Sequence, residues 1–340
     1  MTSFEQPPAE KIPRVAILCP YHNRAGVVAR TFNSIAEQTF ADFEALIWDD
    51  CSTDETWAEM QRVATSLNDP RFNIYRHEAN LGLTPGLNLA LRRTRAKYIA
   101  IVGSGDECHP ERIERQVAAL ERAPDAVFCA TASTTTDPIT KTTFYDSAHH
   151  RETIVFNDIR THCPFTHGSV MYRASALNAV GLYETAFKWC ADWDMFFRLL
   201  RTGQAVYLDE VLYLRTAQAD GVSFAPRKAF DQINCKYLAI KLSGLDESGR
   251  AEVLASVREQ GMEFVLEAEK PEIWRDLARR NVKLYLMGRQ KAGDEMMALI
   301  DGKGVTYPTK YRLFIAVAKL LGKLPVSADF MIRAARALPR

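Results

Sequence analysis

Residues 15–54 read VAILCPYHNRAGVVARTFNSIAEQTFADFEALIWDDCSTD, and this stretch decides the fold. It opens with a continuous apolar run at 15–19, as expected for a strand that is buried on both faces. Apolar residues at helical spacing follow within 27–38, and a second apolar run occupies 43–48. A strand, a helix and another strand in this order predict the start of a parallel sheet whose connections are helices.

The same alternation continues along the chain. Further strands are predicted at 73–76, 98–102 and 126–130, and further helices at 54–63, 82–95 and 111–122. Residues 133–161 show little periodicity and are predicted to be irregular or to form a hairpin. Strand-like runs at 168–172 and 205–214 then flank a helix at 192–200, and from about residue 226 the pattern is nearly all helical.

This order predicts an α/β fold with a Rossmann-like, mainly parallel sheet flanked by helices, followed by a C-terminal helical extension. In such sheets the ligand lies at the carboxyl ends of the strands. Three loops follow strands in the first half of the chain, at 20–24, 49–54 and 103–110. We therefore expect these loops to converge on one site.

The composition is that of a core-forming protein without polyanion-binding character. Of the 340 residues, 47% are hydrophobic and 25% are charged, and the formal net charge is +1, so no nucleic-acid partner is expected. The seven cysteines include no C-x-x-C pair, which favours free thiols and argues against a structural zinc site. The N-terminus lacks the apolar stretch of a signal peptide, and no run of about 18 apolar residues occurs, so a cytoplasmic location is predicted.

Each of the three loops allows a structural and a chemical interpretation. The first is either a polar turn or a phosphate loop in which Arg24 and backbone N–H groups hold a diphosphate, and it matches neither a G-x-G-x-x-G nor a Walker A loop. The second is either a helix start capped by Ser52 or Thr53, or a carboxylate contact to a nucleotide base. In the third, Asp106 belongs either to a Gly-Asp turn or to a divalent metal site.

Taken together and in this order, the loops resemble the family 2 glycosyltransferases, inverting enzymes with the GT-A fold that occur in bacterial cell-surface polysaccharide synthesis. The resemblance is continuous from about Val15 to Leu120 and includes the segments DDCSTDET and NLGLTPGLNLAL. It resumes at THGSVMYRASALNAVGLYET, WCADWDMFFRLLRTG and LYLRTAQADGVS, the last of which ends at Ser223.

The resemblance implies roles for individual residues. The implied nucleotide-binding positions are Pro20, Tyr21, Asn23, Arg24, Asp50, Asn80, Gly82, Asn88, Ser104 and Gly105. Among them, Asp50 matches the residue that usually faces the base, commonly uracil. Asp106 matches the last Asp of the family's D-x-D-D metal element and implies a bound Mn²⁺ or Mg²⁺. Asp192 matches the Asp of the E-D motif that supplies the catalytic base, while His167 and Trp193 fall on the acceptor side.

The chain departs from the family pattern at three places. Where the family has D-x-D-D, residues 103–106 read GSGD, and Glu107 is either a partial substitute or only a first-turn residue of the following helix. The Glu of the E-D pair is Ala191, and the family's Y-R-x-H element reads LRTAQ at 214–218, without the His. These departures bear on the affinity for metal.

The resemblance implies a metal-assisted inverting glycosyltransferase that moves a sugar from a nucleotide-diphosphate sugar, with a UDP-sugar favoured, to a hydroxyl of a glycan or lipid-linked glycan. Asp192 would take the proton of the attacking hydroxyl, unless it only caps the helix that starts at Trp193. The missing carboxylates leave open a catalytically silent protein that binds a nucleotide-sugar or a glycan. A nucleotidyltransferase is disfavoured, because no Gly-rich loop with Arg and Lys follows the first strand.

The sequence predicts three parts of the chain. Residues 1–12 are expected to be a flexible N-terminus, 13–225 a GT-A domain and 226–340 a helical region. Within the GT-A domain, 13–110 would bind the nucleotide and 111–225 the acceptor.

The C-terminal segment 303–340 is strongly basic. It carries eight Lys or Arg against one acid, Asp329, interleaved with aliphatic and aromatic residues. This composition is typical of a helix on an anionic membrane surface, or else of a helical subdomain whose Lys and Arg face water. The first alternative predicts a protein at the inner face of the plasma membrane.

Overall fold

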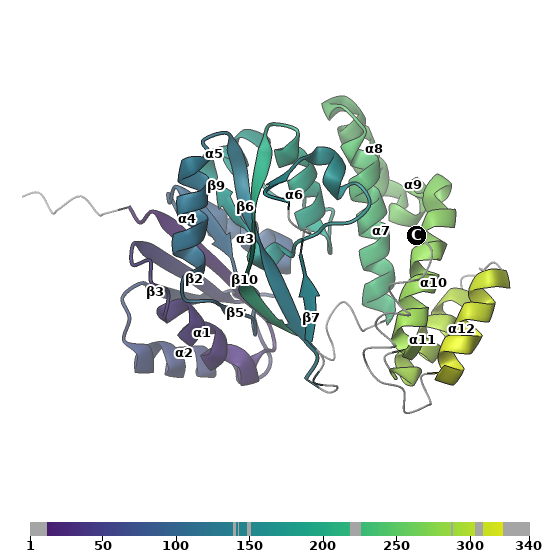
Figure 1. Ribbon diagram of the computed structural model, residues 1–340, viewed down its shortest axis with the longest axis horizontal. Helices are drawn as coiled ribbons and strands as arrows, with labels where there is room; N and C mark the ends of the chain where they lie inside the picture. The colour runs from purple at the N-terminus through teal and green to yellow at the C-terminus, as the bar shows by residue number, and fades with distance from the viewer. Residues whose placement is uncertain are drawn as a thin grey trace, which may run out of the picture. The chain divides into compact units, whose positions relative to one another are not determined.

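Figure 1 shows the fold as a computed structural model, which describes residues 12–138, 141, 143–147, 151–217, 226–286, 288–302 and 309–321. The predicted flexible N-terminus, except Ile12, lies outside the described residues. Contacts within the chain define two compact units. We call them the sheet unit (1–135, 144–183 and 198–215) and the helical unit (136–143, 184–197 and 216–340). Two inner segments thus group with the C-terminal part, and the functional boundary near residue 225 stays a prediction.

The first four strands form the parallel half of the sheet. They are β1 (Val15–Tyr21), β2 (Phe43–Asp49), β3 (Phe72–Arg76) and β4 (Tyr98–Ile101). Strand β1 pairs in parallel with β2 and β4, and β2 pairs in parallel with β3. The connections contain the helices α1 (Val28–Ala36), α2 (Thr56–Leu67) and α3 (Leu83–Arg93), so the predicted strand and helix order is confirmed.

Beyond β4 the sheet continues in the order β9-β6-β10-β5. The further strands are β5 (Glu107–Cys108), β6 (Ala126–Thr136), β7 (Thr143–Asp146), β8 (Thr153–Ile154), β9 (Met171–Arg173) and β10 (Gln204–Thr216). Strand β9 runs antiparallel to β4 and β6, and β10 runs antiparallel to β5 and β8. Residues 137–142 alone separate β6 from its partner β7, too few for a parallel crossover. The predicted α/β fold is confirmed, with parallel pairing in its first half and antiparallel pairing after it.

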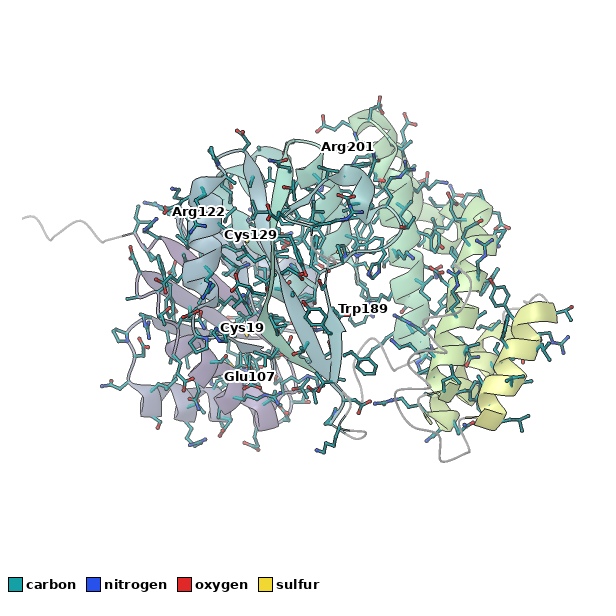
Figure 2. All side chains as sticks on the ribbon, viewed as in Figure 1. Cys19, Glu107, Arg122, Cys129, Trp189 and Arg201 are labelled. Carbon is teal, nitrogen blue, oxygen red and sulfur yellow. The ribbon has the colours of Figure 1, made fainter. Side chains whose placement is uncertain are left out.

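The core of the sheet unit follows from the apolar strands. Alternate residues of β1, among them Val15 and Cys19, are fully buried against Phe32 and Ile35 of α1. Cys19 and Cys129, both labelled in Figure 2, lie among the strands. All seven cysteines are free thiols, as the sequence predicts.

An arginine side chain is fully buried in this core. Arg112, the first residue of α4 (Arg112–Arg122), donates to the carbonyl oxygens of Ile101 (3.1 Å) and Val170 (3.4 Å). Its guanidinium carbon lies 4.8 Å from the ring centroid of Tyr213. A buried guanidinium needs such acceptors because it keeps its charge. Arg112 therefore ties together the strands that carry the third loop.

From residue 226 onward, the residues that the structure describes are mainly helical, as predicted. The helices there are α7 (Pro226–Ser243), α8 (Glu247–Gln260), α9 (Met262–Val265), α10 (Lys270–Leu286), α11 (Gln290–Asp301) and α12 (Thr309–Leu321). Earlier in the chain come α5 (Ala174–Val180) and α6 (Ala191–Leu200), and a 3-10 turn at His167–Ser169 replaces the start of the strand predicted at 168–172. In the part of the chain that the structure describes, no helix has both the length and the apolar character needed to cross a bilayer.

Candidate functional site

Three loops leave neighbouring strands at one edge of the sheet. Strand β1 ends at Tyr21, β2 at Asp49 and β4 at Ile101. Because these strands are parallel neighbours, their carboxyl ends lie side by side. The structure thus brings together the loops that the sequence predicts to converge.

Asn23 joins the first loop to the second. Its N–H donates to Ser52 Oγ (2.9 Å), and its side-chain oxygen accepts from the Thr53 N–H (2.9 Å). The Arg24 N–H donates to Thr56 Oγ1 (2.7 Å). Asn23 has a φ of 52°, a left-handed conformation in which Asn is enriched. The amide of Asn23 therefore shapes the loop, while the half-buried side chain of Arg24 stays a candidate for a phosphate contact.

The side chain of Tyr21 is turned away from the predicted nucleotide site, and the place of this residue in the nucleotide-binding set stays a prediction. Its side chain is 1% exposed, and its ring packs edge-on against Phe32 with the centroids 5.9 Å apart. Burial raises the pKa of the Tyr21 phenol well above its usual value. Strand β1 extends through Pro20 to Tyr21, and the alternation of the strand turns this ring into the core. No side-chain contact with a nucleotide is available there, whereas Pro20 is half-buried and keeps its predicted place.

Asp50 organises the segment that follows β3. Its Oδ1 lies 2.9 Å from His77 Nδ1 and accepts from the Leu81 N–H (3.0 Å), while its Oδ2 accepts from the Gly82 N–H (2.8 Å). Gly82 has a φ of 84°, which glycine permits without strain. These contacts use three of the roughly four acceptor directions of a carboxylate. The predicted contact of Asp50 with a base would use the remaining direction.

The second loop is not a helix start capped by Ser52 or Thr53, which corrects that alternative. Helix α2 begins at Thr56 after Glu55, whose side chain makes no capping hydrogen bond. Ser52 donates instead to the carboxylate of Asp49, because the loop turns back on the end of β2 before the helix begins. Ser52 and Thr53 therefore hold the loop to the end of β2 and to Asn23, while Asp54 accepts from the Thr56 N–H (3.0 Å) at the start of α2.

The two predicted asparagines beyond β3 differ in their surroundings. Asn80 is exposed, and its Nδ2 lies 3.1 Å from His22 Nδ1. Asn88 on α3 donates to the Tyr183 carbonyl oxygen (2.9 Å) and accepts from the Tyr183 N–H (3.0 Å). Both ends of the Asn88 amide thus hold backbone, and its place at the border of the donor pocket stays a prediction.

Helix α1 holds the third loop through Arg30 and Thr31. Thr31 Oγ1 accepts from the Gly105 N–H (2.9 Å) and donates to the Asp106 carbonyl oxygen (2.8 Å). Arg30 donates to the Gly105 carbonyl oxygen, and its Nε lies 3.4 Å from a carboxylate oxygen of Glu107. Both backbone groups of Gly105 are therefore engaged, which fixes the backbone from which the Asp106 side chain leaves.

Tyr213 of β10 is a site residue that the sequence did not reveal. Its hydroxyl accepts from the Gly103 N–H (2.8 Å) and donates to Asp106 Oδ2 (2.7 Å). Burial, and after it the charge of Asp106, raises the pKa of the Tyr213 phenol well above its usual value, so it remains a donor at neutral pH. The two residues are 107 positions apart, and no local pattern signals their contact.

Glycines make room for this pair, and they explain the departure from D-x-D-D. A Cβ at Gly103 would lie 2.7 Å from Asp106 Oδ2, and one at Gly168 would lie 2.1 Å from the Tyr213 hydroxyl. Gly105 has a φ of 88°, a conformation that a side chain disfavours. The family's first two carboxylates are thus replaced by residues that this loop geometry requires to be small.

The side chains near Asp106 fit a metal that is shared with a substrate. No group of three or more His, Cys, Asp and Glu that could hold a metal ion occurs among the described residues. Glu107 lies in β5 and faces Arg30, and α4 begins only at Arg112, so the first-turn alternative for Glu107 is wrong. One carboxylate is enough for such a metal when substrate phosphates supply further ligands.

His167 belongs to a chain of aromatic side chains in the sheet unit. Its Nε2 lies 2.8 Å from the Tyr183 hydroxyl, and that hydroxyl donates to the hydroxyl of Tyr172 (3.3 Å). The His167 and Tyr183 rings meet edge-on with centroids 5.6 Å apart. His167 is therefore held in one orientation, and its place on the acceptor side stays a prediction.

Asp192 and Trp193 lie in the first turn of α6, within the helical unit. Helix α6 begins at Ala191, so Asp192 is inside the helix, and the alternative that it caps the helix is wrong. Asp192 makes no side-chain hydrogen bond or ion pair with any residue that the structure describes. By contrast, Asp194 is fully buried, and its Oδ1 lies 2.7 Å from Arg250 Nη2. The role of Asp192 as a base, and its expected meeting with the third loop, stay predictions.

Comparison with known proteins identifies the family of the chain. The model described as "Glycosyl transferase family 2" matches residues 16–185, half of the chain. The protein WcaA of Escherichia coli (strain K12) carries a name that assigns it provisionally as a colanic acid biosynthesis glycosyl transferase, and it is 33% identical over 101 residues. That match covers 30% of this chain and 36% of WcaA, so it spans about a third of this relative's length.

Two solved structures share the fold. TarS 1–349 of S. aureus, in complex with UDP-GlcNAc, superimposes with a TM-score of 0.55 at 19% identity, over 87% of this chain and 93% of that structure. The mannosyltransferase PcManGT from Pyrobaculum calidifontis, in complex with GDP-Man and Mn²⁺, gives a TM-score of 0.55 at 16% identity, over 93% and 89% of the two chains. These likenesses confirm the GT-A architecture, and the family match over half of the sequence shows that the chain belongs to glycosyl transferase family 2.

Proposed function

We propose that the protein is a metal-assisted inverting glycosyltransferase that moves a sugar from a nucleotide-diphosphate sugar, with a UDP-sugar favoured, to a hydroxyl of a glycan or lipid-linked glycan. The observation that carries the proposal is the hydrogen bond from buried Tyr213 to Asp106, in the loop whose sequence resembles the metal element of the family. TarS with UDP-GlcNAc and PcManGT with GDP-Man and Mn²⁺ support a nucleotide-sugar donor and a divalent metal. The name of WcaA supports a role in polysaccharide biosynthesis.

The donor is proposed to lie on the loops at the carboxyl ends of β1, β2 and β4. Arg24 would pair with the diphosphate, because a guanidinium gives charge-assisted hydrogen bonds to phosphate oxygens. Asp50 would accept from a ring N–H of the base through its remaining acceptor direction. Asn80 and Ser104, which border the same loops, would contact the donor from either side.

Asp106 is proposed to hold Mn²⁺ or Mg²⁺ together with the diphosphate of the donor. When bound, the metal supplies positive charge that stabilises the leaving diphosphate. Tyr213 acts as a positioning residue, because its hydroxyl fixes the rotation of the Asp106 carboxylate. Arg30 and Thr31 fix the backbone on which Asp106 stands.

Asp192 is proposed to act as the general base. As the acceptor oxygen bonds to the anomeric carbon of the donor, its proton passes to the Asp192 carboxylate, and the bond from that carbon to the diphosphate oxygen breaks. A single in-line displacement of this kind inverts the anomeric centre. His167 and Trp193 are proposed to lie on the acceptor side.

UDP is expected to raise the melting temperature of the protein more with Mn²⁺ than with EDTA, because a ligand that binds only the folded form stabilises it. In Asp106→Asn the additional rise in melting temperature that Mn²⁺ causes should vanish. In Tyr213→Phe the same rise should require about tenfold more Mn²⁺, because metal affinity falls by about this factor when a metal ligand loses its orienting hydrogen bond. The measurement is a thermal-shift titration of Mn²⁺ at saturating UDP.

Glu107→Gln is the matched control, because its carboxylate faces Arg30, and it also tests the alternative that Glu107 partly substitutes for the missing metal ligands. It should respond to Mn²⁺ as the wild type does. A full Mn²⁺ response in Asp106→Asn, or its loss in Glu107→Gln alone, would move the metal away from Asp106.

Helix α12 is proposed to rest on an anionic membrane surface at the inner face of the plasma membrane. One face of this helix is buried, through Tyr311, Ile315 and Ala318. Its other face exposes large apolar side chains, namely Leu313, Phe314, Val317 and Leu320. Arg312 is exposed beside them, as in helices that lie in an anionic interface, whereas Lys319 pairs with Asp294. The remaining parts of the basic segment, 303–308 and 322–340, lie outside the described residues.

The wild type is expected to pellet with phosphatidylglycerol-containing vesicles at low salt, and less at high salt. Leu313→Gln combined with Leu320→Gln should largely abolish pelleting, because it removes the exposed apolar contact without uncovering the buried face of α12. Phe264→Gln, a change of an exposed apolar residue outside α12, is the control and should pellet like the wild type. Equal pelleting of all three proteins would count against membrane docking through this helix.

A further inference from the structure

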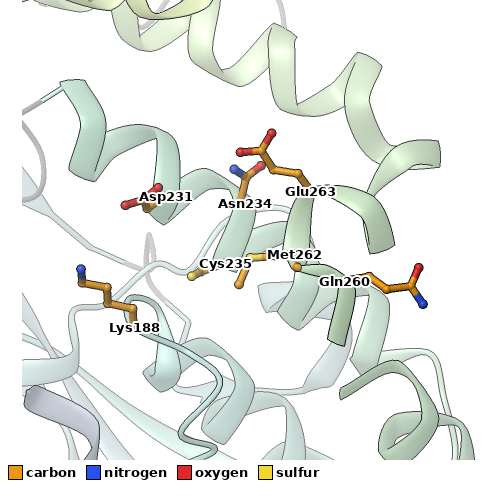
Figure 3. Close-up of a pocket in the computed structure, with 8 residues that line it drawn as sticks. Lys188, Asp231, Asn234, Cys235, Gln260, Met262 and Glu263 are labelled. Atoms are coloured by element: carbon orange, nitrogen blue, oxygen red, sulfur yellow. The ribbon is translucent and has the colours of Figure 1, made fainter. Parts of the chain in front are cut away.

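The helical unit contains a pocket of about 390 Å³ that none of the roles above uses. Its walls come from the segment before α6, from α7 and from the junction of α8 and α9 (Figure 3). The polar lining consists of Lys188, Asp231, Asn234, Gln260 and Glu263. The volume is in the range of small-molecule sites, which run from roughly 300 to 1,000 Å³.

Asn234 of α7 is the lining residue that points to a ligand. It is 5% exposed and lines the pocket, yet its side chain makes no hydrogen bond within the described part of the chain. Its amide is not among the described side-chain groups that are cut off from solvent without a partner, so water in the pocket can reach it. A molecule bound in the pocket would replace that water as the hydrogen-bond partner of Asn234.

The lining favours a neutral ligand with many hydroxyl groups. Two carboxylates accept hydrogen bonds, the two amides both donate and accept, and the ammonium of Lys188 donates. A sugar hydroxyl can likewise donate and accept, so a pyranose matches this mixture. A phosphate-bearing ligand matches it less well, because the lining holds two carboxylates, which also have contacts within the chain, and a single ammonium.

The pocket adjoins the helix turn that carries the proposed base. Cys190, directly before α6, donates its thiol to the carbonyl oxygen of Gln232 on α7 (3.5 Å). Lys188 lies four residues before Asp192 in the sequence, just ahead of α6. Burial raises the pKa of the Cys235 thiol to about 11, and the charges of Asp231 and Asp192 add to this rise. Cys190 also has a φ of 54°, a left-handed conformation that costs stability at a residue other than Gly.

We propose that this pocket binds a pyranose unit of the acceptor glycan and so helps to select the acceptor. The inference rests on the proposed function, because it takes Asp192 as the base for an acceptor hydroxyl. Asp231, Asn234 and Glu263 would hydrogen-bond the bound sugar away from the reacting atoms. Their loss is therefore expected to raise the KM for the acceptor and to leave donor binding unchanged.

Saturation-transfer difference NMR with methyl pyranosides of glucose, galactose, mannose and N-acetylglucosamine tests the pocket directly. At least one of the four is expected to bind the wild type. Asn234→Leu should weaken that binding about tenfold or more, because the sugar loses the amide and meets an apolar side chain. Asn281→Leu is the matched control: Asn281 is fully buried on α10, its amide also lacks a partner among the described residues, and it does not line the pocket.

Asp231→Ala provides a second variant that does not disturb a buried residue of α7, and it should weaken the same pyranoside. Donor hydrolysis in water and the thermal shift with UDP keep the two proposals apart. If the wild type neither binds UDP nor hydrolyses a donor, the proposed function fails, whereas pyranoside binding lost in Asn234→Leu still supports the pocket. Absence of pyranoside binding in the wild type, or equal binding in Asn234→Leu and Asp231→Ala, overturns the pocket assignment.

Discussion

The Asp192→Asn variant is expected to lose about 10²- to 10⁴-fold in kcat for sugar transfer, with its affinity for UDP unchanged. Asparagine keeps the shape of the side chain but cannot take the proton of the acceptor hydroxyl. Asp192 forms no hydrogen bond or ion pair with the described residues, so the substitution breaks no structural contact among them. Initial rates of transfer from a UDP-sugar and calorimetric titration with UDP measure the two quantities.

Asp301→Asn is the matched control for this variant. Asp301 is an exposed residue at the end of α11, and the same loss of charge there should leave kcat within error of the wild type. A kcat of Asp192→Asn within a few-fold of the wild type would place the base on another residue. A wild type that binds UDP firmly but transfers and hydrolyses nothing would favour the catalytically silent alternative.

The parallel half of the fold could be predicted because its signals are local. Continuous apolar runs such as 15–19 and 43–48 mark strands that are buried on both faces, and the helices between them keep a regular spacing. The antiparallel half gave weaker signals. Strands β5 and β8 have two residues each, too few for an alternation to show, and their pairing depends on residues that are distant in sequence.

The candidate site divides in the same way. The three loops could be predicted, because carboxyl ends of parallel strands meet at one edge. The burial of the Tyr21 ring could not be predicted, because β1 continues for one residue beyond Pro20 and turns the ring into the core. Tyr213 and Arg30 could not be predicted, because they reach the third loop across 107 and 75 positions of sequence, where only the tertiary fold sets the contact.

The role of the glycines at 103 and 105 could not be predicted from the sequence. In the sequence, they replace two carboxylates of the family pattern and suggest a weakened metal site. In the structure, they leave the space in which Asp106 meets the Tyr213 hydroxyl. The departure from D-x-D-D therefore changes how the Asp106 carboxylate is oriented. The Mn²⁺ titration of Tyr213→Phe measures how much the hydrogen bond from Tyr213 contributes to metal affinity.

The Arg250→Ala variant is expected to lose about 3–5 kcal/mol in the free energy of unfolding, since it removes a cation that pairs with a buried carboxylate. Asp194 is fully buried, and Arg250 of α8 lies 2.7 Å away with its side chain 16% exposed. Urea unfolding followed by circular dichroism measures the loss. Arg258→Ala in the same helix is the control, because Arg258 is 63% exposed and lies 3.6 Å from Glu184. An exposed pair of this kind contributes about 0–1 kcal/mol.

Replacing both Asp194 and Arg250 distinguishes the effect of the unpaired charge on stability from the effect of lost side-chain packing. Asp194→Leu combined with Arg250→Met should recover much of the stability lost in Arg250→Ala, because no charge then remains buried without its partner. The double variant should also keep UDP affinity, since the pair belongs to the helical unit and the proposed donor loops belong to the sheet unit. Equal stability of Arg250→Ala and Arg258→Ala would mean that Asp194 is held by its other neighbours. The first turn of α6, and with it Asp192, would then be fixed without α8.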